Sequence, residues 1–268
     1  RGSVAWSIDQ TDVLIMGTVK QIRALAAKIK KQPFGLNVIA LELLDLLDNA
    51  ERNRHVLKTS KREIVLGDRT LTMGILNVTP DSFSDGSCYF DHQKAVERGL
   101  QMAREGADII DVGGESSRPG AASVTARQEM ARVLPVVESL SGKLNIPISV
   151  DTTKSPVAQK ALEAGAEMIN DISALTRDKK MAAVIRKAGA AVVLMHMRGK
   201  PADMQRGDLA YDNLMEEITG YLKNCCTRAL AAGIERDRIV IDPGIGFGKT
   251  YEDNCKIINK LEELKALG

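Results

Sequence analysis

The feature that most constrains the fold is a repeat of short apolar runs and amphipathic stretches, which begins near Thr72 and continues along the rest of the chain. Each apolar run ends in polar residues, and each following stretch has the spacing of a helix. The expected strands are residues 71–78, 108–113, 146–151, 167–171, 191–197 and 239–242. The helices are expected to begin near His92, Thr125, Ser155, Lys179, Asp212 and Tyr251. Because the strand runs lack strict alternation, the pattern predicts an α/β fold with a parallel sheet buried on both faces.

Repeated βα units form either a doubly wound open sheet or a closed (β/α)8 barrel. Polar residues lie at or near the ends of different strands: Asn77, Asp111, Asp151, Asn170, His196 and Asp242. A barrel collects its site from several strands at once, whereas an open sheet concentrates it at one switch point. The pattern therefore favours a TIM barrel. About six of roughly eight units are visible, so we expect the C-terminal units to be absent from this chain.

The N-terminal part of the chain lies outside the repeat. It is expected to contain a strand at residues 12–17, helices at 19–31 and 36–49, and a hairpin of residues 64–67 with 69–72 that covers the bottom of the barrel. The predicted domains are an α/β extension at residues 1–64 and an incomplete barrel at 65–268.

Composition excludes several classes of partner. Lys and Arg number 37 against 35 Asp and Glu, so the chain has no strong field that would attract nucleic acid. No stretch has the length and apolar character of a membrane span. The cysteines, Cys88, Cys225, Cys226 and Cys255, lack metal-ligand spacing, which favours a reducing, cytoplasmic location.

Two loops after strands are unusually polar. Residues 79–91 are too long for a simple βα connection, which indicates a functional loop rather than a plain surface loop. The second loop follows paired glycines and contains Ser117 and Arg118. An exposed arginine is usually only solvated, but this one is expected at the barrel mouth, where its planar fork suits phosphate or carboxylate.

Asp151, Asn170 and Asp242 each follow apolar strand residues and are expected to be partly buried. A buried carboxylate needs hydrogen-bond donors, and a ligand with a guanidine-like edge, such as that of a pterin, supplies paired N–H groups. Asp151 could instead cap the helix that begins near Ser155. Three such residues facing one cavity favour the binding interpretation.

The segment 242–250 resembles a phosphate-binding loop that ends in Gly-Lys-Thr, but it has Pro243 where that pattern requires glycine. Nucleotide binding through Lys249 is therefore a weak hypothesis. Phe247, on the same glycine-rich loop, could cover a flat ligand. His196 has no evident second ligand and receives no assigned role.

Several motifs are similar to those of the dihydropteroate synthase family: MGILNVTPDSFSDG at 73–86, IIDVGGESSRPG at 109–120 and DPGIGFGK at 242–249, with SVDT, IND and LMHM segments between them. The resemblance implies condensation of a pterin pyrophosphate with 4-aminobenzoate in folate biosynthesis, membership of a family that sulfonamides target, and a homodimer. It also implies Mg²⁺ on Asn77, and a pterin held by Ser117, Asp151, Asn170 and Asp242 with Asp111 and Met195 in the same pocket. Asp85, Arg118 and Pro119 would close over the reacting groups, and Phe247 would shape the aminobenzoate slot.

The chain departs from the family pattern in two places. Ser87 stands where the first loop usually has a second glycine, and the Ser-Arg-Lys and Arg-x-His segments of the last two strands are absent. Two alternatives stay open. A methyltetrahydrofolate–corrinoid methyltransferase shares the pterin-binding barrel, but the loops at residues 79–86 and 116–120 argue against it. A pterin-binding protein without turnover would fit the absent C-terminal segments.

Overall fold

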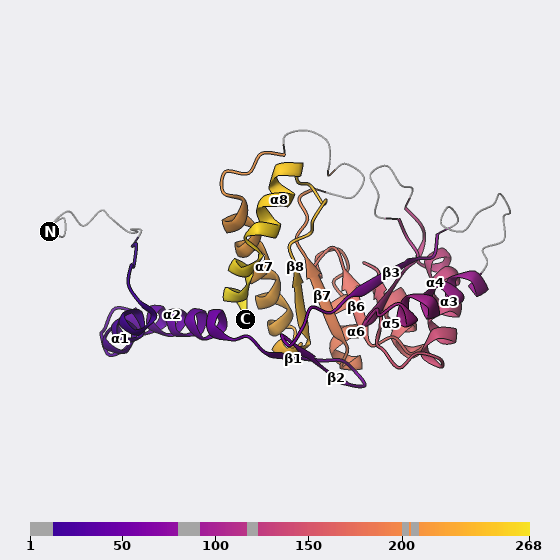
Figure 1. The fold of residues 1–268 in the computed structure, drawn as a ribbon, viewed down its shortest axis with the longest axis horizontal. Helices are drawn as coiled ribbons and strands as arrows, with labels where there is room; N and C mark the ends of the chain where they lie inside the picture. Colours follow the sequence, from indigo (N-terminus) through magenta and orange to yellow (C-terminus); the bar gives the residue numbers. More distant parts are fainter. Residues whose placement is uncertain (1–12, 80–91, 117–122, 200–203, 205–208) are drawn as a thin grey trace. The chain divides into compact units, whose positions relative to one another are not determined.

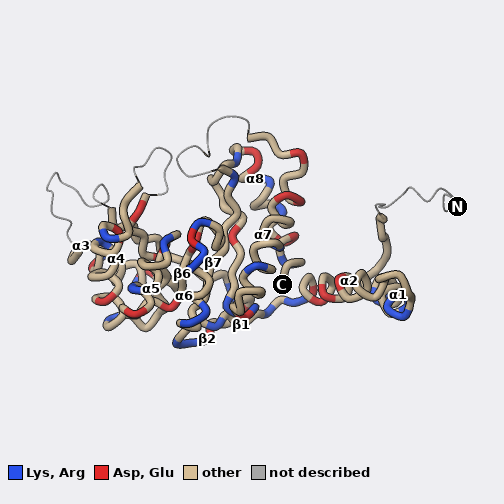
Figure 2. The backbone as a smooth tube through the Cα atoms, turned by 180° about the vertical axis from the view of Figure 1, so that it is seen from behind, with Lys and Arg blue, Asp and Glu red and all other residues tan. Residues whose placement is uncertain are grey.

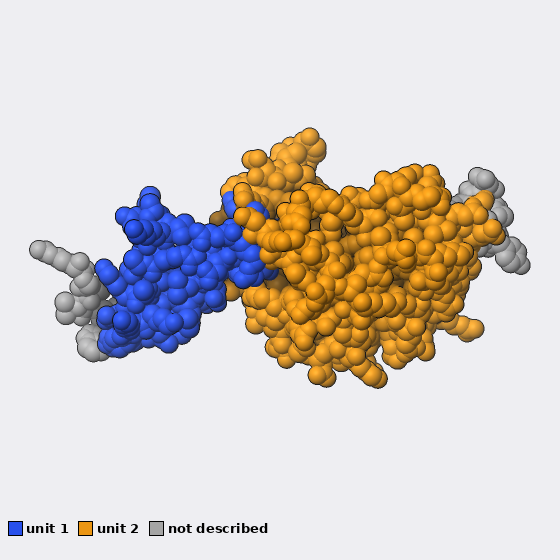
Figure 3. Space-filling model, turned by 60° about the horizontal axis from the view of Figure 1, so that its bottom comes forward, with its two compact units in different colours: residues 1–52, 263–268 blue, residues 53–262 orange. Residues whose placement is uncertain are grey.

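The computed structural model describes residues 13–79, 92–116, 123–199, 204 and 209–268 (Figure 1). The chain forms two compact units, which are residues 1–52 with 263–268 and residues 53–262 (Figure 3). The units divide at Arg52, whereas the predicted domains divide at residue 64; the domain assignment itself stays a prediction.

The larger unit contains a six-stranded parallel sheet in which each strand pairs with the next one along the chain. An open doubly wound sheet would reverse its strand order at a switch point, so this order is the one expected of a barrel. The fold is thus the predicted α/β barrel type, represented here by six of its strands. These strands are β3 (Met73–Asn77), β4 (Ile109–Gly113), β5 (Ile148–Asp151), β6 (Met168–Asp171), β7 (Ala191–Met195) and β8 (Ile239–Asp242).

A helix follows each strand, and the observed starts lie within two residues of the expected ones. Thr125 and Thr250 begin their helices with capping boxes, in which each threonine hydroxyl accepts from the backbone N–H three residues later. The helices are α3 (His92–Arg104), α4 (Ala126–Ser141), α5 (Ser155–Glu163), α6 (Met181–Ala188), α7 (Leu214–Ala231) and α8 (Tyr251–Asn259), with short 3-10 turns at Arg236–Arg238 and Leu261–Leu267.

Side chains alternate between the two faces of each strand, which gives two apolar clusters, one on each face. The polar side chains lie towards the carboxyl ends of the strands, which form the mouth of the barrel. In β4, Ile110 and Val112 pack against the helices, in a core that also contains Val136 and Ile185. Ile109 belongs to a second cluster with Met168 and Ala191, from the starts of their own strands. Asp111 points to the same side as Ile109, one step closer to the carboxyl end of the sheet. The polar residues therefore lie above an apolar floor.

An antiparallel hairpin covers this floor, as predicted, but it forms at a different place in the sequence. Strands β1 (His55–Lys58) and β2 (Glu63–Leu66) pair, and Leu57 packs with Ile109 and Met168. The turn is at Thr59, whose hydroxyl accepts from the Lys61 and Arg62 backbone N–H groups. Gly67 is not a turn glycine: it has φ of 108°, and a Cβ there would lie 1.9 Å from the Asn53 carbonyl oxygen.

The smaller unit contains two helices, α1 (Val19–Ile29) and α2 (Leu36–Glu51). The predicted strand at residues 12–17 was wrong over its described part, 13–17, which has no strand structure. An apolar run becomes a strand only when another strand pairs with it, and local sequence does not reveal that partner. Among the described residues, no helix has the length and apolar character to cross a bilayer. The cytoplasmic location stays a prediction.

Candidate active site

The carboxyl ends of the strands bring the predicted polar residues to one edge of the sheet. In the register, Asn77 pairs with Gly113, Gly113 with Asp151, and Asp151 with Asn170. Further along the sheet, Met195 pairs with Asp242. Residues that are far apart in sequence therefore share one mouth, as the strand-end pattern predicted.

Asp111 and Asn170 form a buried polar pair at this mouth. The Asn170 amide nitrogen donates to Asp111 Oδ2 at 3.0 Å, and Asp111 is 2% exposed. Burial raises the pKa of Asp111, although the neighbouring Ser149 hydroxyl and the Asn170 amide favour its ionised form. Asp111 Oδ1 and Asn170 Oδ1 have no hydrogen-bond partner among the described residues. The buried Ser149 hydroxyl beside Asp111 also has no partner among the described residues. Buried polar atoms are normally hydrogen-bonded, so this group of atoms is suited to a ligand with N–H donors.

Two further acceptor oxygens, Asn77 Oδ1 and Asp151 Oδ2, lie close to Gly113, which has no side chain to separate them. A Cβ on Gly113 would lie 3.5 Å from Asn77 Oδ1 and 3.8 Å from Asp151 Oδ2. Burial raises the pKa of Asp151 well above its usual value, and the nearby carboxylates of Asp111 and Glu129 add to the effect. An ionised Asp151 is therefore costly until a donor or a cation approaches it.

Oxygens of this kind are the ligands that Mg²⁺ prefers. The described residues contain no group of three or more His, Cys, Asp and Glu side chains that could hold a metal. Mg²⁺ commonly takes only one or two protein oxygens and completes its shell with phosphates and water. The Asn77 amide oxygen, with Asp151 nearby, fits that mode of binding.

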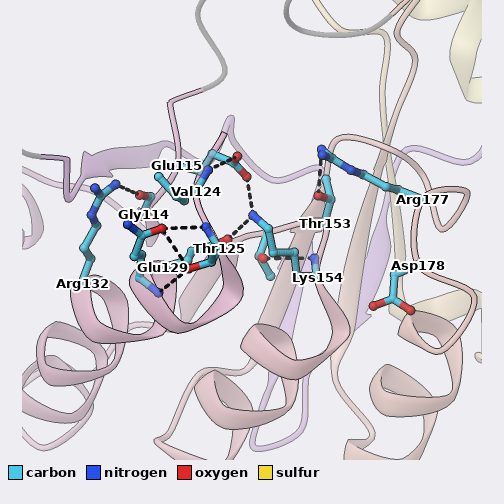
Figure 4. Close-up of polar contacts among 12 residues, drawn as sticks. Gly114, Glu115, Val124, Thr125, Glu129, Arg132, Thr153, Lys154, Arg177 and Asp178 are labelled. Carbon is cyan, nitrogen blue, oxygen red and sulfur yellow. Dashed lines mark hydrogen bonds and ion pairs between the residues drawn. The ribbon is translucent and has the colours of Figure 1, made fainter. Parts of the chain in front are cut away.

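A lysine between two glutamates joins the base of the second polar loop to β5 and α4 (Figure 4). Lys154 Nζ contacts Glu115 Oε2 and Glu129 Oε2, both at 2.5 Å. The other oxygen of Glu115 accepts from the Val124 N–H at 3.1 Å, which links residues on either side of the loop. Glu129 is fully buried, so its charge depends on Lys154.

No motif in the sequence marks this network. The only local signal was a lysine three residues after Asp151, the last residue of β5. Its partners are 25 and 39 residues away along the chain, so no helical spacing reveals them.

The glycine-rich loop after β8 is held by Lys249, which is 3% exposed. Its ammonium donates to the carbonyls of Gly244 at 2.9 Å and Phe247 at 3.0 Å, and lies 3.0 Å from His196 Nδ1. Burial lowers the pKa of Lys249 to about 8, while Asp242 acts in the opposite direction. Because its hydrogens point into its own loop, Lys249 is a structural residue of this loop, which argues against the phosphate-binding interpretation.

The same loop fixes Asp242. Its carboxylate accepts from the Gly244 N–H at 2.7 Å, and burial raises its pKa. Gly244 has φ of 70°, and a Cβ there would lie 2.0 Å from the His196 carbonyl oxygen. Only glycine permits this approach of the two loops.

Comparison with known proteins agrees with this geometry. The model of the family described as pterin binding enzyme matches residues 73–268. A dihydropteroate synthase from Clostridium beijerinckii is 47% identical over 212 residues, which are 79% of this chain and 76% of that protein.

The chain belongs to the dihydropteroate synthase family.

A solved structure and a bifunctional relative are also similar to this chain. A Xanthomonas albilineans dihydropteroate synthase solved with 4-aminobenzoic acid is 43% identical with a TM-score of 0.71, covering 79% of this chain and 74% of that one. A probable bifunctional folylpolyglutamate synthase/dihydropteroate synthase from Halobacterium salinarum is 40% identical over all 268 residues, which are 32% of its length. The bifunctional relative thus also matches the N-terminal extension.

Membership makes the chain a transferase, while the roles of individual residues stay predictions. The described strand ends and the β8 loop contain Asn77, Asp111, Asp151, Asn170, Met195, Asp242 and Phe247. The remaining predicted residues lie outside the described part of the chain: Asp85, Ser117, Arg118 and Pro119.

Proposed function

We propose that this dihydropteroate synthase condenses 6-hydroxymethyl-7,8-dihydropterin pyrophosphate with 4-aminobenzoate, giving 7,8-dihydropteroate and pyrophosphate for folate biosynthesis. The observation that carries the proposal is the Asp111–Asn170 pair near the strand ends beside Asp151, in which one buried oxygen of each side chain has no partner within the described part of the chain. A pterin presents adjacent N–H donors along one edge, and unsatisfied acceptors in a buried site select for such a ligand.

The carboxylates would bind the pterin and stabilise its reacting form. Asp151, Asn170 and Asp242 would grip the ring with Ser117, while Asp111 and Met195 line the pocket. When the bond between the pterin CH₂ and the pyrophosphate oxygen breaks, positive charge develops on the pterin. Buried, preorganised carboxylates stabilise that charge more strongly than water would.

The leaving group requires a separate stabilisation. Asn77 would hold the Mg²⁺ that accompanies the pyrophosphate, and the bound ion would supply positive charge to the leaving group. On the other side, the aminobenzoate amine forms the new C–N bond at the same CH₂ and loses a proton to the solvent. Phe247 would shape its slot, and Asp85, Arg118 and Pro119 would exclude water from the reacting groups.

The test is pyrophosphate release with the pterin pyrophosphate and Mg²⁺, with and without 4-aminobenzoate. We expect release coupled to dihydropteroate formation, its loss in Asp151→Ala and its retention in Asp178→Ala, which changes an aspartate at another helix start. Asn77→Ala should raise the Mg²⁺ concentration needed for half-maximal rate. Tight pterin binding without release would contradict the proposal, and methyl transfer to a corrinoid protein would reassign the chain.

A further inference from the structure

The two helices of the smaller unit leave much of their apolar surface exposed. In α2, Ile39 and Leu46 are 46% and 48% exposed, as are Val38 (55%) and Leu41 (45%), and in α1, Leu25 is 36% exposed. The residues buried in these helices are only Ala26 and Ala40. A helix pair buries one stripe of each partner, so a second apolar stripe points to a further interaction.

Leu25, Ile39 and Leu46 lie on one flank of the helix pair. On the opposite flank, Arg23 joins the helices through ion pairs with Asp48 at 2.7 Å and Glu51 at 2.6 Å. Ile39 and Leu46 are seven residues apart, which places them on the same side of α2 and away from Asp48. Leu25 is two residues from Arg23 and therefore faces away from those pairs. We call Leu25, Ile39 and Leu46 the apolar flank.

The charges of the two helices are segregated. The acidic residues of α2 are Glu42, Asp45, Asp48 and Glu51, and the helix has no basic residue, whereas α1 contains Lys20, Arg23 and Lys28 and no acidic residue. Figure 2 shows this as red on α2 and blue on α1.

Lys28 and Glu42 are the charges nearest to the apolar flank. Lys28 lies three residues after Leu25, and Glu42 lies three after Ile39 and four before Leu46, so each is adjacent to the flank on its helix. Both side chains are exposed.

We propose that the apolar flank binds the apolar flank of a second copy of this chain, with α1 of each copy packed on α2 of the other. A two-fold interface requires a surface that complements itself. Here Lys28 of each copy would meet Glu42 of the other, whereas an α2-to-α2 arrangement would bring acidic residues together. The result would be a four-helix arrangement with an apolar centre and a rim of opposite charges.

The experiment is sedimentation velocity of the full chain over a range of concentrations. Leu46→Glu should remove one association step, because it places a charge in the apolar centre. Lys28→Glu and Glu42→Lys should each weaken that step about tenfold, since two like-charge contacts replace two attractive ones. Lys20→Glu, the same change elsewhere on α1, should leave the step unchanged, and circular dichroism verifies that every variant retains its helices.

The decisive measurement mixes the two single variants. Lys28→Glu has glutamate at both rim positions and Glu42→Lys has lysine at both, so a mixed pair regains two opposite-charge contacts. We expect equimolar mixing to restore the association that each variant alone has weakened. Absence of any step that depends on Leu46, or failure of the mixture to recover, would overturn the proposal and assign the flank to another part of the protein or to another partner.

Discussion

Nζ of Lys249 lies 3.0 Å from Nδ1 of His196, and both side chains are buried where the β7 and β8 loops meet. The ring also packs edge-on against Tyr221, with centroids 5.0 Å apart. Because the ammonium is a donor, Nδ1 acts as the acceptor, so the ring is neutral with its proton on Nε2. The loop that contains Asp242 and Phe247 thus depends on a contact between two residues with no direct role in the proposed reaction.

Replacing this lysine should destabilise the protein and loosen the aminobenzoate slot. Lys249→Met leaves the Gly244 and Phe247 carbonyls without their buried donor, and we expect a loss of about 1–3 kcal/mol in the free energy of unfolding. Urea denaturation measures it, with exposed Lys256→Met as the control. KM for 4-aminobenzoate should rise more than the pterin Kd; an equal rise in both would contradict a local effect on the Phe247 loop.

The pH dependence of stability should report His196. Burial and the Lys249 charge lower the pKa of His196 to about 4, from an unfolded value of 6.5. Between these values the unfolded chain binds the extra proton, so stability falls as pH decreases, by up to about 3 kcal/mol. NMR titration should find one histidine that stays neutral to about pH 4, and His196→Gln should remove both that resonance and this part of the slope. Titration of all three histidines near pH 6.5 would refute the prediction.

Asp151 should show a conflict between stability and function. Because its pKa is raised by burial and by neighbouring carboxylates, the ionised side chain costs folding stability at neutral pH. Asp151→Asn should therefore increase the free energy of unfolding while weakening pterin binding by about 10- to 100-fold.

Asp178 provides the contrast for this prediction. Its carboxylate accepts from the Ser155 N–H at 2.8 Å, and its pKa is lowered. Asp178→Asn should decrease stability and leave pterin binding nearly unchanged. Parallel chemical denaturation and calorimetric titration test both variants, and a loss of stability in Asp151→Asn would be evidence against repulsion among the site carboxylates.

Lys154 should be important for stability because of Glu129. Lys154→Met leaves a fully buried glutamate without its cation, at a cost of about 3–5 kcal/mol. Lys160→Met removes an exposed lysine that pairs with Glu163, and should cost about 1 kcal/mol or less. In Lys154→Met/Glu129→Leu the buried charge is gone, so part of the lost stability should return; equal losses in the single and double variants would exclude this explanation.

Local sequence was sufficient for the order of βα units and for the strand ends. Apolar runs that end in Asn77, Asp111, Asp151, Asn170 and Asp242 mark where parallel strands leave the core, and the structure places these residues at one edge. Both signals depend only on neighbours along the chain. The floor hairpin was expected in the correct role but in the wrong register, because Gly67 was interpreted as a turn residue and the Thr59 turn was missed.

What the sequence by itself determined, therefore, was the repeating architecture, the family motifs and the residue types at the mouth. Only the tertiary structure decided that Lys154 pairs with Glu115 and Glu129, that Lys249 supports its own loop, and that residues 13–17 form no strand. The physical reason is the same in each case. Burial and pairing depend on which distant elements pack together, and that packing sets whether a lysine becomes a ligand contact or a structural support.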